Sequence, residues 1–427
     1  MELFEHQKQA LDLTKNLNKV AYYLDMGLGK TFVGAEKMVQ LGASVNLVVC
    51  QKSKVQDWID HFFKYYKTEY LVFDLTNRTE FDAFFSYQKQ EEFYERIGVI
   101  NYDLIFRRPQ FKQLQDFTLM LDESSLIQND KAKRSKFILS LNPSNVILLS
   151  GTPTSGKYEN LWTQIHLLGW TISQNTYNKQ YINWKKIYIG GFPQQIVNKD
   201  DPYKNVDRLK MKMREHGAVF MKTEECFDLP EQTFIPVTVG TTKEYRKFKR
   251  DSIITVDDVE LIGDTTLTKM MYSRMLCGQY NKDKLQSFKD LVESTSDRLI
   301  VFYNFNEELN QLKKIAESLE RPVSEVNGHV KDLDAYEHED DSITFVQYQA
   351  GSMGLNLQKA NKIIYFTLPL LSEHFEQSKK RIHRIGQTNT CFYYLMVCKD
   401  SIEEKILQTL EIRKDYTDEL FKESNLW

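Results

Sequence analysis

The sequence has few cysteines, and they form no pattern that binds metal or builds a disulfide framework. Among its 427 residues there are five, none in a C-x-x-C spacing: Cys50, Cys226, Cys277, Cys391 and Cys398. This scatter argues against a zinc knuckle and against a disulfide-stapled secreted domain, and it fits a reducing compartment.

Long hydrophobic runs and a signal peptide are also missing. No apolar run approaches the ~18 residues of a membrane-spanning helix, and residues 1–9 lack the signal-peptide pattern. We therefore expect a cytoplasmic protein that has no membrane partner.

A net basic charge is absent as well, because the formal net charge is −3. Basic residues do cluster locally, at 131–134, 243–250 and 379–384, and an acidic stretch covers 332–341. A solvated surface is the plainer interpretation of any one cluster. A role in nucleic-acid binding depends on whether the fold brings the basic clusters onto one face.

Two successions of short apolar runs, separated by helical patterns, organise the chain. The first covers 20–24, 45–50, 70–73, 97–102, 119–121 and 146–149. The second covers 299–303, 323–326, 343–346, 363–366 and 392–397. Such alternation predicts βαβ units and a buried parallel sheet, here twice, so we expect an α/β protein with two lobes. Ligands of such sheets bind beyond the carboxyl ends of the strands.

The segment between the two successions, residues 170–291, has a different character. It holds a Gly-Gly-Phe-Pro turn at 190–193 and two helical patterns, at 206–215 and 243–252. Residues 234–237 are expected to be an extended crossing between the lobes. We find no low-complexity linker and no short internal repeat.

A glycine turn lies between the apolar run at 20–24 and a helical run at 32–38. A strand, a glycine turn and a helix N-terminus build a nest of backbone N–H groups that cradles a polyphosphate. Lys30 would reach the β- and γ-phosphates, and the Thr31 hydroxyl would bind Mg²⁺. Leu24 stands where the general pattern has its first glycine.

Two carboxylates, Asp122 and Glu123, follow the apolar run at 119–121. Asp122 would hold Mg²⁺ through water, and Glu123 would orient and deprotonate the attacking water. The alternative is a capping pair that starts a helix. The turn at 150–153 also follows an apolar run, and its hydroxyls would sense the phosphate.

In the second lobe, Gln377, Arg381 and Arg384 have i, i+4 and i+7 spacing. A helix over 372–385 would place them on one face. Two arginines beside a phosphate site would stabilise the charge that develops in phosphoryl transfer.

Together these motifs resemble the Snf2 family of helicase superfamily 2 ATPases, whose phosphate loop does not begin with glycine. The matching residues of that loop are Asp25, Met26, Gly27, Leu28, Gly29, Lys30 and Thr31. Further segments resemble the other motifs of this family, in order and at family spacing: Leu3 with Gln7, 47–53 with Trp58, 101–103, 122–129, 150–153 with 160–162, 350–357, and 377–387. Gln51 stands in place of a usual proline. Ser125 replaces a usual histidine, which puts a contact between motifs II and III in doubt.

The resemblance implies two RecA-like lobes, at 1–226 and 227–427, with helical insertions near 172–215 and 243–283. It implies ATP and Mg²⁺ as cofactors, bound between the lobes. The implied nucleotide contacts are Gln7, Met26, Gly27, Leu28, Gly29, Lys30, Thr31, Gly354 and Gln377, with Thr31 and Asp122 on the metal. The implied catalytic residues are Lys30, Asp122, Glu123, Arg381 and Arg384.

The expected macromolecular partner is double-stranded or branched DNA, gripped by its backbone. Candidate contacts are Lys52, Ser53 and Asn101, with backbone amides near Gly354. Replication or repair proteins are further candidate partners, and we expect a monomer. The richness in Lys, Asn, Ile and Tyr suggests an AT-rich bacterial or phage genome. The motif II and III variants lean towards the annealing-helicase branch of the family.

Three functions compete. The first is an ATPase that translocates on duplex DNA or remodels branched DNA, and the second is a strand-separating DNA or RNA helicase. Against the second, the sequence has no obvious separation-pin hairpin, and motif II is not Asp-Glu-Ala-Asp. The third is an ATP-binding sensor or scaffold with negligible turnover, against which the intact set of catalytic residues argues.

Overall fold

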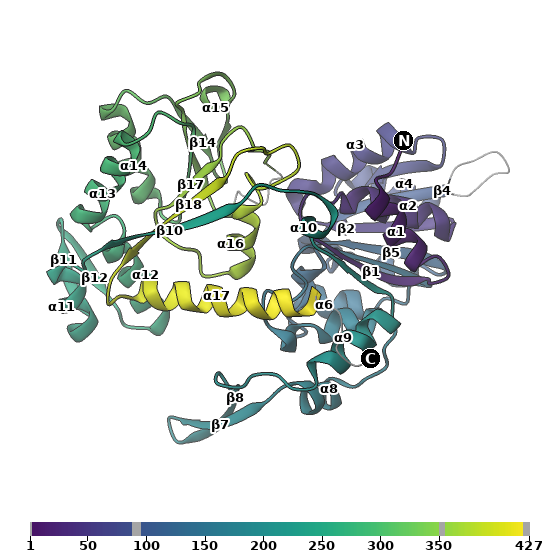
Figure 1. The fold of residues 1–427 in the computed structure, drawn as a ribbon. Helices are drawn as coiled ribbons and strands as arrows, with labels where there is room; N and C mark the ends of the chain where they lie inside the picture. The colour runs from purple at the N-terminus through teal and green to yellow at the C-terminus, as the bar shows by residue number, and fades with distance from the viewer. Residues whose placement is uncertain (1, 88–94, 350–354, 422–427) are drawn as a thin grey trace. The chain divides into compact units, whose positions relative to one another are not determined.

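The computed structural model describes residues 2–87, 95–349 and 355–421, and it divides into two compact units (Figure 1). Unit 1 comprises Met1–Cys226 together with Asp415–Trp427, and unit 2 comprises Phe227–Lys414. The last residues of the C-terminal helix α17 (Ile402–Phe421) therefore belong to unit 1.

Unit 1 is built on a seven-stranded sheet whose strand pairs are all parallel. The spatial order is β3 (Tyr70–Asp74), β4 (Glu95–Asn101), β2 (Val45–Cys50), β5 (Phe117–Asp122), β6 (Asn145–Ser150), β1 (Lys19–Leu24) and β9 (Ala218–Met221). Its α-helices are α1 (Glu5–Leu13), α2 (Lys30–Leu41), α3 (Val55–Tyr65), α4 (Arg78–Ser86), α5 (Tyr102–Ile105), α6 (Lys133–Leu139), α7 (Trp162–Leu167), α8 (Gln174–Tyr181), α9 (Val206–Glu215) and α10 (Thr223–Cys226). The central strands are buried along nearly their whole length, which is why they read as continuous apolar runs.

The register of unit 1 aligns the carboxyl ends of three strands. Tyr23 of β1 lies opposite Ser150 of β6, and Asp122 of β5 lies opposite Leu149 of β6. Neighbouring strands are roughly 4.8 Å apart, so the loops after β1, β6 and β5 start side by side at one edge of the sheet.

Unit 2 is built on a second seven-stranded sheet. Its order is β10 (Gln232–Val239), β18 (Cys391–Cys398), β17 (Lys362–Tyr365), β13 (Leu299–Tyr303), β16 (Ile343–Gln347), β14 (Val323–Val326) and β15 (Lys331–Asp332). The strands pair in parallel except for β14 with β15. Its remaining elements are α11 (Lys243–Asp251), β11 (Ile253–Val256), β12 (Val259–Ile262), α12 (Thr266–Cys277), α13 (Lys282–Glu293), α14 (Asn306–Ser318), α15 (Asp334–His338) and α16 (Ser372–Lys379).

The prediction of two parallel α/β lobes with short insertions is confirmed, and all eleven strands expected from the apolar runs are present. Residues 234–237 are extended, as expected, but they lie within β10, an edge strand that pairs with β18 over its whole length. Pro236 is tolerated there because an edge strand has one side without a ladder.

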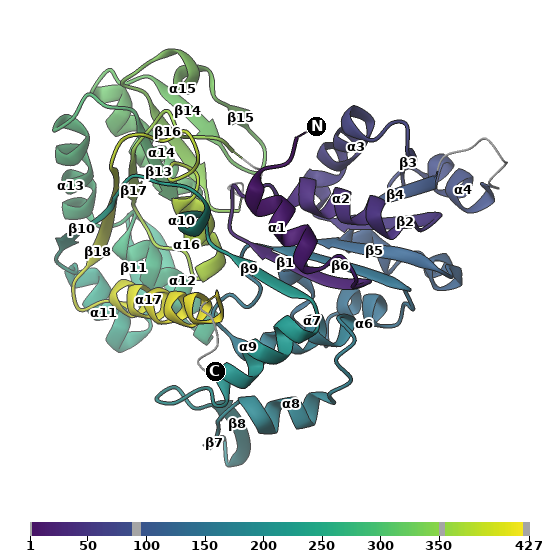
Figure 2. The ribbon, with the colours of Figure 1, turned by 45° about the vertical axis from the view of Figure 1, so that its right-hand side comes forward.

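The insertion of unit 1 contains a feature that the sequence analysis did not predict. Between α8 and α9 the chain forms an antiparallel hairpin of β7 (Trp184–Ile189) and β8 (Phe192–Val197) (Figures 1 and 2). From the sequence only the turn at 190–193 is predicted, and the residues on either side of it pair as strands.

Across the described ranges, no helix combines the length and apolar character that crossing a membrane requires. All five cysteines are free thiols.

Candidate nucleotide-binding site

The predicted phosphate loop, residues 25–31, connects β1 to α2 through two glycines in the left-handed region. Gly27 has φ +92° and Gly29, the residue before α2, has φ +73°. A side chain at Gly27 would meet open space, whereas a Cβ at Gly29 would lie 2.3 Å from Gln7 Nε2. Gly29 is favoured by its backbone conformation, and a side chain there would also have to displace the Gln7 amide.

Helix α1 secures this loop from outside. Gln7 Nε2 donates a hydrogen bond to the Leu28 carbonyl at 3.1 Å, and a ring nitrogen of His6 lies 2.9 Å from the same oxygen. Gln7 is 3% exposed. The predicted contact residue Gln7 thus lies against the loop, and Met26, Gly27, Leu28 and Gly29 form the loop itself.

Lys30 and Thr31 open α2, half-buried. Lys30 Nζ donates to the Leu24 carbonyl at 2.9 Å and to the Asp25 carbonyl at 3.4 Å. A Cβ on Gly151 would lie 3.4 Å from this ammonium group. The lysine is held at the carboxyl edge of the sheet, between the loops that follow β1 and β6.

Asp122 ends β5, and its carboxylate is oriented by a tryptophan 64 residues earlier. Trp58 Nε1 on α3 donates to Asp122 Oδ2 at 2.9 Å, and Trp58 is 2% exposed. Burial raises the pKa of the Asp122 carboxyl, while the Trp58 hydrogen bond and the positive charge of Lys30 oppose the rise. A desolvated carboxylate whose negative charge is held by fixed donors suits a divalent cation.

Glu123 is the next residue, and its backbone is left-handed, with φ +51°. Ser150, the last residue of β6, donates from Oγ to Glu123 Oε2 at 3.4 Å. Tyr102 donates from its hydroxyl to the Asp122 carbonyl at 2.9 Å. A non-glycine residue in this conformation costs free energy and persists where surrounding contacts hold it.

A glutamine on α7 joins the loop after β5 to the loop after β6. Gln164 Oε1 accepts from Ser124 Oγ at 2.7 Å, and Gln164 Nε2 donates to the Pro153 carbonyl at 2.7 Å. The side chain is fully buried. The contact between motifs II and III that Ser125 put in doubt therefore exists, through Gln164 and through Ser150 with Glu123. No sequence pattern predicts a role for Gln164 or for the indole of Trp58.

The arginines of unit 2 do not lie on a helix. Helix α16 ends at Lys379, and Arg381 and Arg384 lie in the turns beyond it. Arg381 is 3% exposed and donates to the Leu355 carbonyl at 3.4 Å, and its own carbonyl accepts from Leu357 N. The prediction that Gln377, Arg381 and Arg384 share one helical face was wrong, because the N–H groups of Arg381 and Ile382 bond to carbonyls three residues back, in tight turns that replace the helix.

The remaining predicted residues occupy varied environments. Gln377 is buried in α16 and donates to Glu373. Gly354 lies outside the described residues. Lys52 and Ser53 are exposed directly after β2, whereas Asn101, at the end of β4, is 7% exposed. Burial lowers the pKa of the Arg384 guanidinium.

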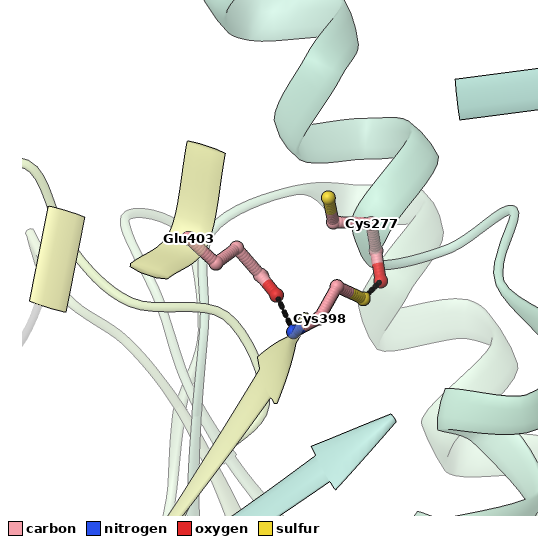
Figure 3. Close-up of side chains that lie close together, drawn as sticks. All are labelled: Cys277, Cys398 and Glu403. Atoms are coloured by element: carbon pink, nitrogen blue, oxygen red, sulfur yellow. Dashed lines mark hydrogen bonds between the residues drawn. The ribbon is translucent and has the colours of Figure 1, made fainter. Parts of the chain in front are cut away.

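A second cluster lies in unit 2, where Cys277, Cys398 and Glu403 bring possible metal-ligating atoms within 4.8 Å of one another (Figure 3). Lys284 Nζ lies 2.7 Å and 2.8 Å from the two Glu403 oxygens and neutralises the carboxylate. Burial raises the pKa of the Cys277 thiol well above its ordinary value, so this sulfur stays protonated. We interpret the cluster as a charge-balanced packing contact and not as a metal site.

Family models match most of the chain. Residues 13–283 match the SNF2-related domain, and residues 283–386 match the helicase conserved C-terminal domain. The chain is 23% identical to the putative ATP-dependent helicase/translocase YwqA of Bacillus subtilis over 343 residues, which cover 72% of this chain and 36% of YwqA. It is 21% identical to a mouse SWI/SNF-related chromatin regulator, subfamily A member 1, over 91% of this chain and 40% of the regulator.

The chain thus spans well under half the length of these two relatives. Among solved structures, it is similar to the Sulfolobus solfataricus SWI2/SNF2 ATPase core in complex with double-stranded DNA. The TM-score is 0.45 and the identity 19%, over 99% of this chain and 94% of the other.

Proposed function

The chain belongs to the SNF2-related family of superfamily 2 ATPases, and from this premise we propose that it couples ATP hydrolysis to movement along, or reshaping of, double-stranded or branched DNA. The observation that supports the ATPase step best is the convergence of Lys30, Asp122 and Glu123 at one edge of the first sheet. Their loops follow β1 and β5, on either side of β6.

Each side chain has a proposed task in hydrolysis. Lys30 binds the terminal phosphates, and Asp122 and Thr31 hold the Mg²⁺ that would screen the phosphate charge. Glu123 accepts a proton from the attacking water, and Ser150 holds one oxygen of that carboxylate in place. We assign Arg381 and Arg384 the stabilisation of the transferring phosphoryl group.

Two substitutions test the ATPase assignment. Lys30→Ala is expected to abolish measurable turnover, and Glu123→Gln is expected to bind ATP and leave it uncleaved, with kcat lowered by at least about 100-fold. Turnover is measured by phosphate release and binding by a fluorescent nucleotide. Normal hydrolysis by Glu123→Gln would show that Glu123 is not the general base.

The kind of nucleic acid on which the protein acts is tested separately. ATPase rates are compared with blunt duplex, single-stranded DNA, forked DNA and RNA, all at the same salt concentration. We expect duplex and forked DNA to stimulate the wild-type rate most. Stimulation by RNA alone would contradict a duplex translocase.

Strand separation is a second candidate, and one observation favours it. A strand-separating helicase needs a protruding pin, and the sequence shows no obvious hairpin of that kind. The β7–β8 hairpin is a protruding element that would serve as such a pin. Unwinding of a forked substrate, measured without a trapping strand, would favour this second function. Displacement of a triplex strand without unwinding would favour translocation instead.

A further inference from the structure

The β7–β8 hairpin has a turn whose backbone conformation favours glycine. The strands pair from Trp184 opposite Val197 to Ile189 opposite Phe192. The two residues between them, Gly190 and Gly191, have φ +58° and +83°. A two-residue turn with both φ values positive matches the twist of the strands and holds the ribbon in one register.

The base of this hairpin is anchored in the core of unit 1. Tyr181 and Ile182, which precede it, are each 1% exposed, and Ile182 forms a bridge with Tyr203. Tyr203 stacks on the buried Tyr158 with 4.3 Å between ring centroids. Asn198 N donates to the Asn183 carbonyl at 2.8 Å and closes the base of the ribbon. The hairpin is therefore an ordered arm on a fixed support, and it projects beyond α8 and α9 (Figure 2).

The outer half of the arm exposes aromatic rings. Tyr188 is 69% exposed and Phe192 is 75% exposed, with Trp184 at 39% nearer the base. Because Tyr188 pairs with Pro193 while Phe192 pairs with Ile189, the two rings lie on opposite faces of the ribbon. Rings this exposed add little to the stability of the fold and are accessible to a partner.

Charge indicates what kind of partner the arm fits. The paired hairpin, residues 184–197, contains Lys185 and Lys186 and no acidic residue, and Lys199 is followed by Asp200 and Asp201 beyond its base. Every second residue of β7 lies on the same face of the ribbon, so the cation of Lys186 lies between the rings of Trp184 and Tyr188. The hairpin of unit 2, β11–β12, is the opposite case: its turn is Asp257-Asp258, and its exposed side chains Val259 and Ile262 are aliphatic. Exposed rings interleaved with lysines match a polyanion that carries flat bases.

We propose that the β7–β8 hairpin is a nucleic-acid-binding arm whose tip stacks on unpaired bases at a junction between duplex and single strands. Tyr188 and Phe192 each stack on a base of one separated strand, and Lys185 and Lys186 contact the adjacent phosphates. This inference rests on the proposed action on nucleic acid and adds a preference for branched or opened substrates.

The test is Tyr188→Ala combined with Phe192→Ala in the full chain. Both side chains are exposed, so the thermal unfolding midpoint and the ATPase rate without DNA are expected to stay unchanged. Affinity for a fork with two unpaired arms is expected to fall at least about 20-fold, since one stacked base contributes about 1–3 kcal/mol. Affinity for blunt duplex of the same length is expected to change less than about twofold. A fork carrying 2-aminopurine at its junction is expected to change fluorescence with the wild type only.

Two matched variants control for the loss of surface. Tyr188→Phe with Phe192→Tyr keeps both rings and is expected to restore fork binding. Val259→Ala with Ile262→Ala trims the other hairpin and is expected to bind forks as the wild type does.

Lys185→Ala with Lys186→Ala should lower the slope of log fork affinity against log salt by roughly 1.4, the value for two phosphate contacts to single strands.

If the alanine variant bound forks with wild-type affinity, the proposal that the hairpin stacks on unpaired bases would be overturned, and the ATPase assignment would remain intact. A wild type that binds no nucleic acid, and that no nucleic acid stimulates, would overturn both proposals.

Discussion

At the scale of single residues, the carboxylate of Asp122 depends on a donor that lies on another element. The Trp58 indole reaches it at 2.9 Å from α3. This bond has a direction, so it fixes which way the carboxylate faces at the end of β5. Charge-assisted hydrogen bonds of this kind stabilise by about 1.5–3 kcal/mol.

Trp58→Phe keeps the buried ring and removes only the donor. We expect the apparent affinity for Mg²⁺ in the ATPase reaction to fall roughly 10-fold or more. Mn²⁺ binding in the presence of a non-hydrolysable nucleotide, followed by electron paramagnetic resonance, checks the same change without turnover. Trp162→Phe, which removes an indole bond to the Ile172 carbonyl at 3.0 Å, is the matched control. Equal Mn²⁺ affinity in wild type and Trp58→Phe would contradict the orienting role.

Glu308 is a second residue whose charge state depends on the fold. Its Oε2 accepts from the N–H groups of Asn304 and Phe305 and from Thr367 Oγ1, whereas Oε1 finds no donor among the described residues. Burial raises the pKa of this carboxyl above its ordinary value. The folded state therefore binds a proton that the unfolded state releases near pH 4.3.

The raised pKa sets the direction of a pH effect. The contribution of Glu308 to stability is fully present below the unfolded pKa, and it is lost as pH rises through the folded pKa. Glu308→Gln can keep the three accepted bonds and cannot ionise. We expect its free energy of unfolding, measured in urea, to fall less between pH 4.5 and 7.5 than that of the wild type. Parallel pH profiles of the two proteins would argue against this assignment.

At the scale of elements, α13, β18 and α17 meet at a fully buried ion pair. Lys284 is 0% exposed and Glu403 1% exposed, and Glu403 also accepts the backbone N–H of Cys398. Burial alone would lower the pKa of the Lys284 ammonium, but the charge of Glu403 raises it above the ordinary value. The pair is stable in its charged form only while both partners are present.

Lys284→Met leaves Glu403 buried without its cation. We expect a loss of about 3–5 kcal/mol in the free energy of unfolding at neutral pH. Adding Glu403→Gln removes the uncompensated charge and keeps an acceptor for Cys398 N, so the double variant should recover a large part of the loss. Equal stabilities of the single and double variants would show that the charge is not the cause.

Elements also show how far sequence patterns reach. Strands such as β2 and β13 are predicted to within a residue, because buried parallel strands are short apolar runs. Helix α16 is not, because the apolar and polar pattern of 372–385 does not reveal that the chain turns at Lys380 and meets residues 355–357 through Arg381. The Gly190-Gly191 pair is a strong local hairpin signal, although the prediction from the sequence covered only the turn and not the two strands.

At the scale of the whole molecule, the net charge of −3 means that electrostatic attraction to DNA must come from local basic groups. Lys52 is exposed after β2, at the carboxyl edge of the first sheet, which also carries Lys30 and Asp122. Lys67 is exposed before β3 and so lies at the amino edge.

These positions give a salt test for duplex binding. We expect Lys52→Ala to reduce the slope of log affinity against log salt by about 0.9, the value for one phosphate contact on duplex DNA. Lys67→Ala has the same charge change and is expected to leave the slope unchanged. The measurement is fluorescence anisotropy with blunt duplexes of two unrelated sequences, which should give equal affinities. Equal slopes for Lys52→Ala and wild type would remove Lys52 from the DNA contacts.

The sequence by itself determined the two α/β lobes, the phosphate loop and the carboxylate pair at 122–123. These features are local: backbone sterics, glycine at positive φ and the burial of apolar runs act over a few residues. The tertiary structure alone decided which distant groups meet. Trp58 reaches Asp122, Gln164 joins the loops after β5 and β6, and Leu357 N donates to the Arg381 carbonyl beyond α16. Such partners are set by strand order and register, which no short stretch of sequence encodes.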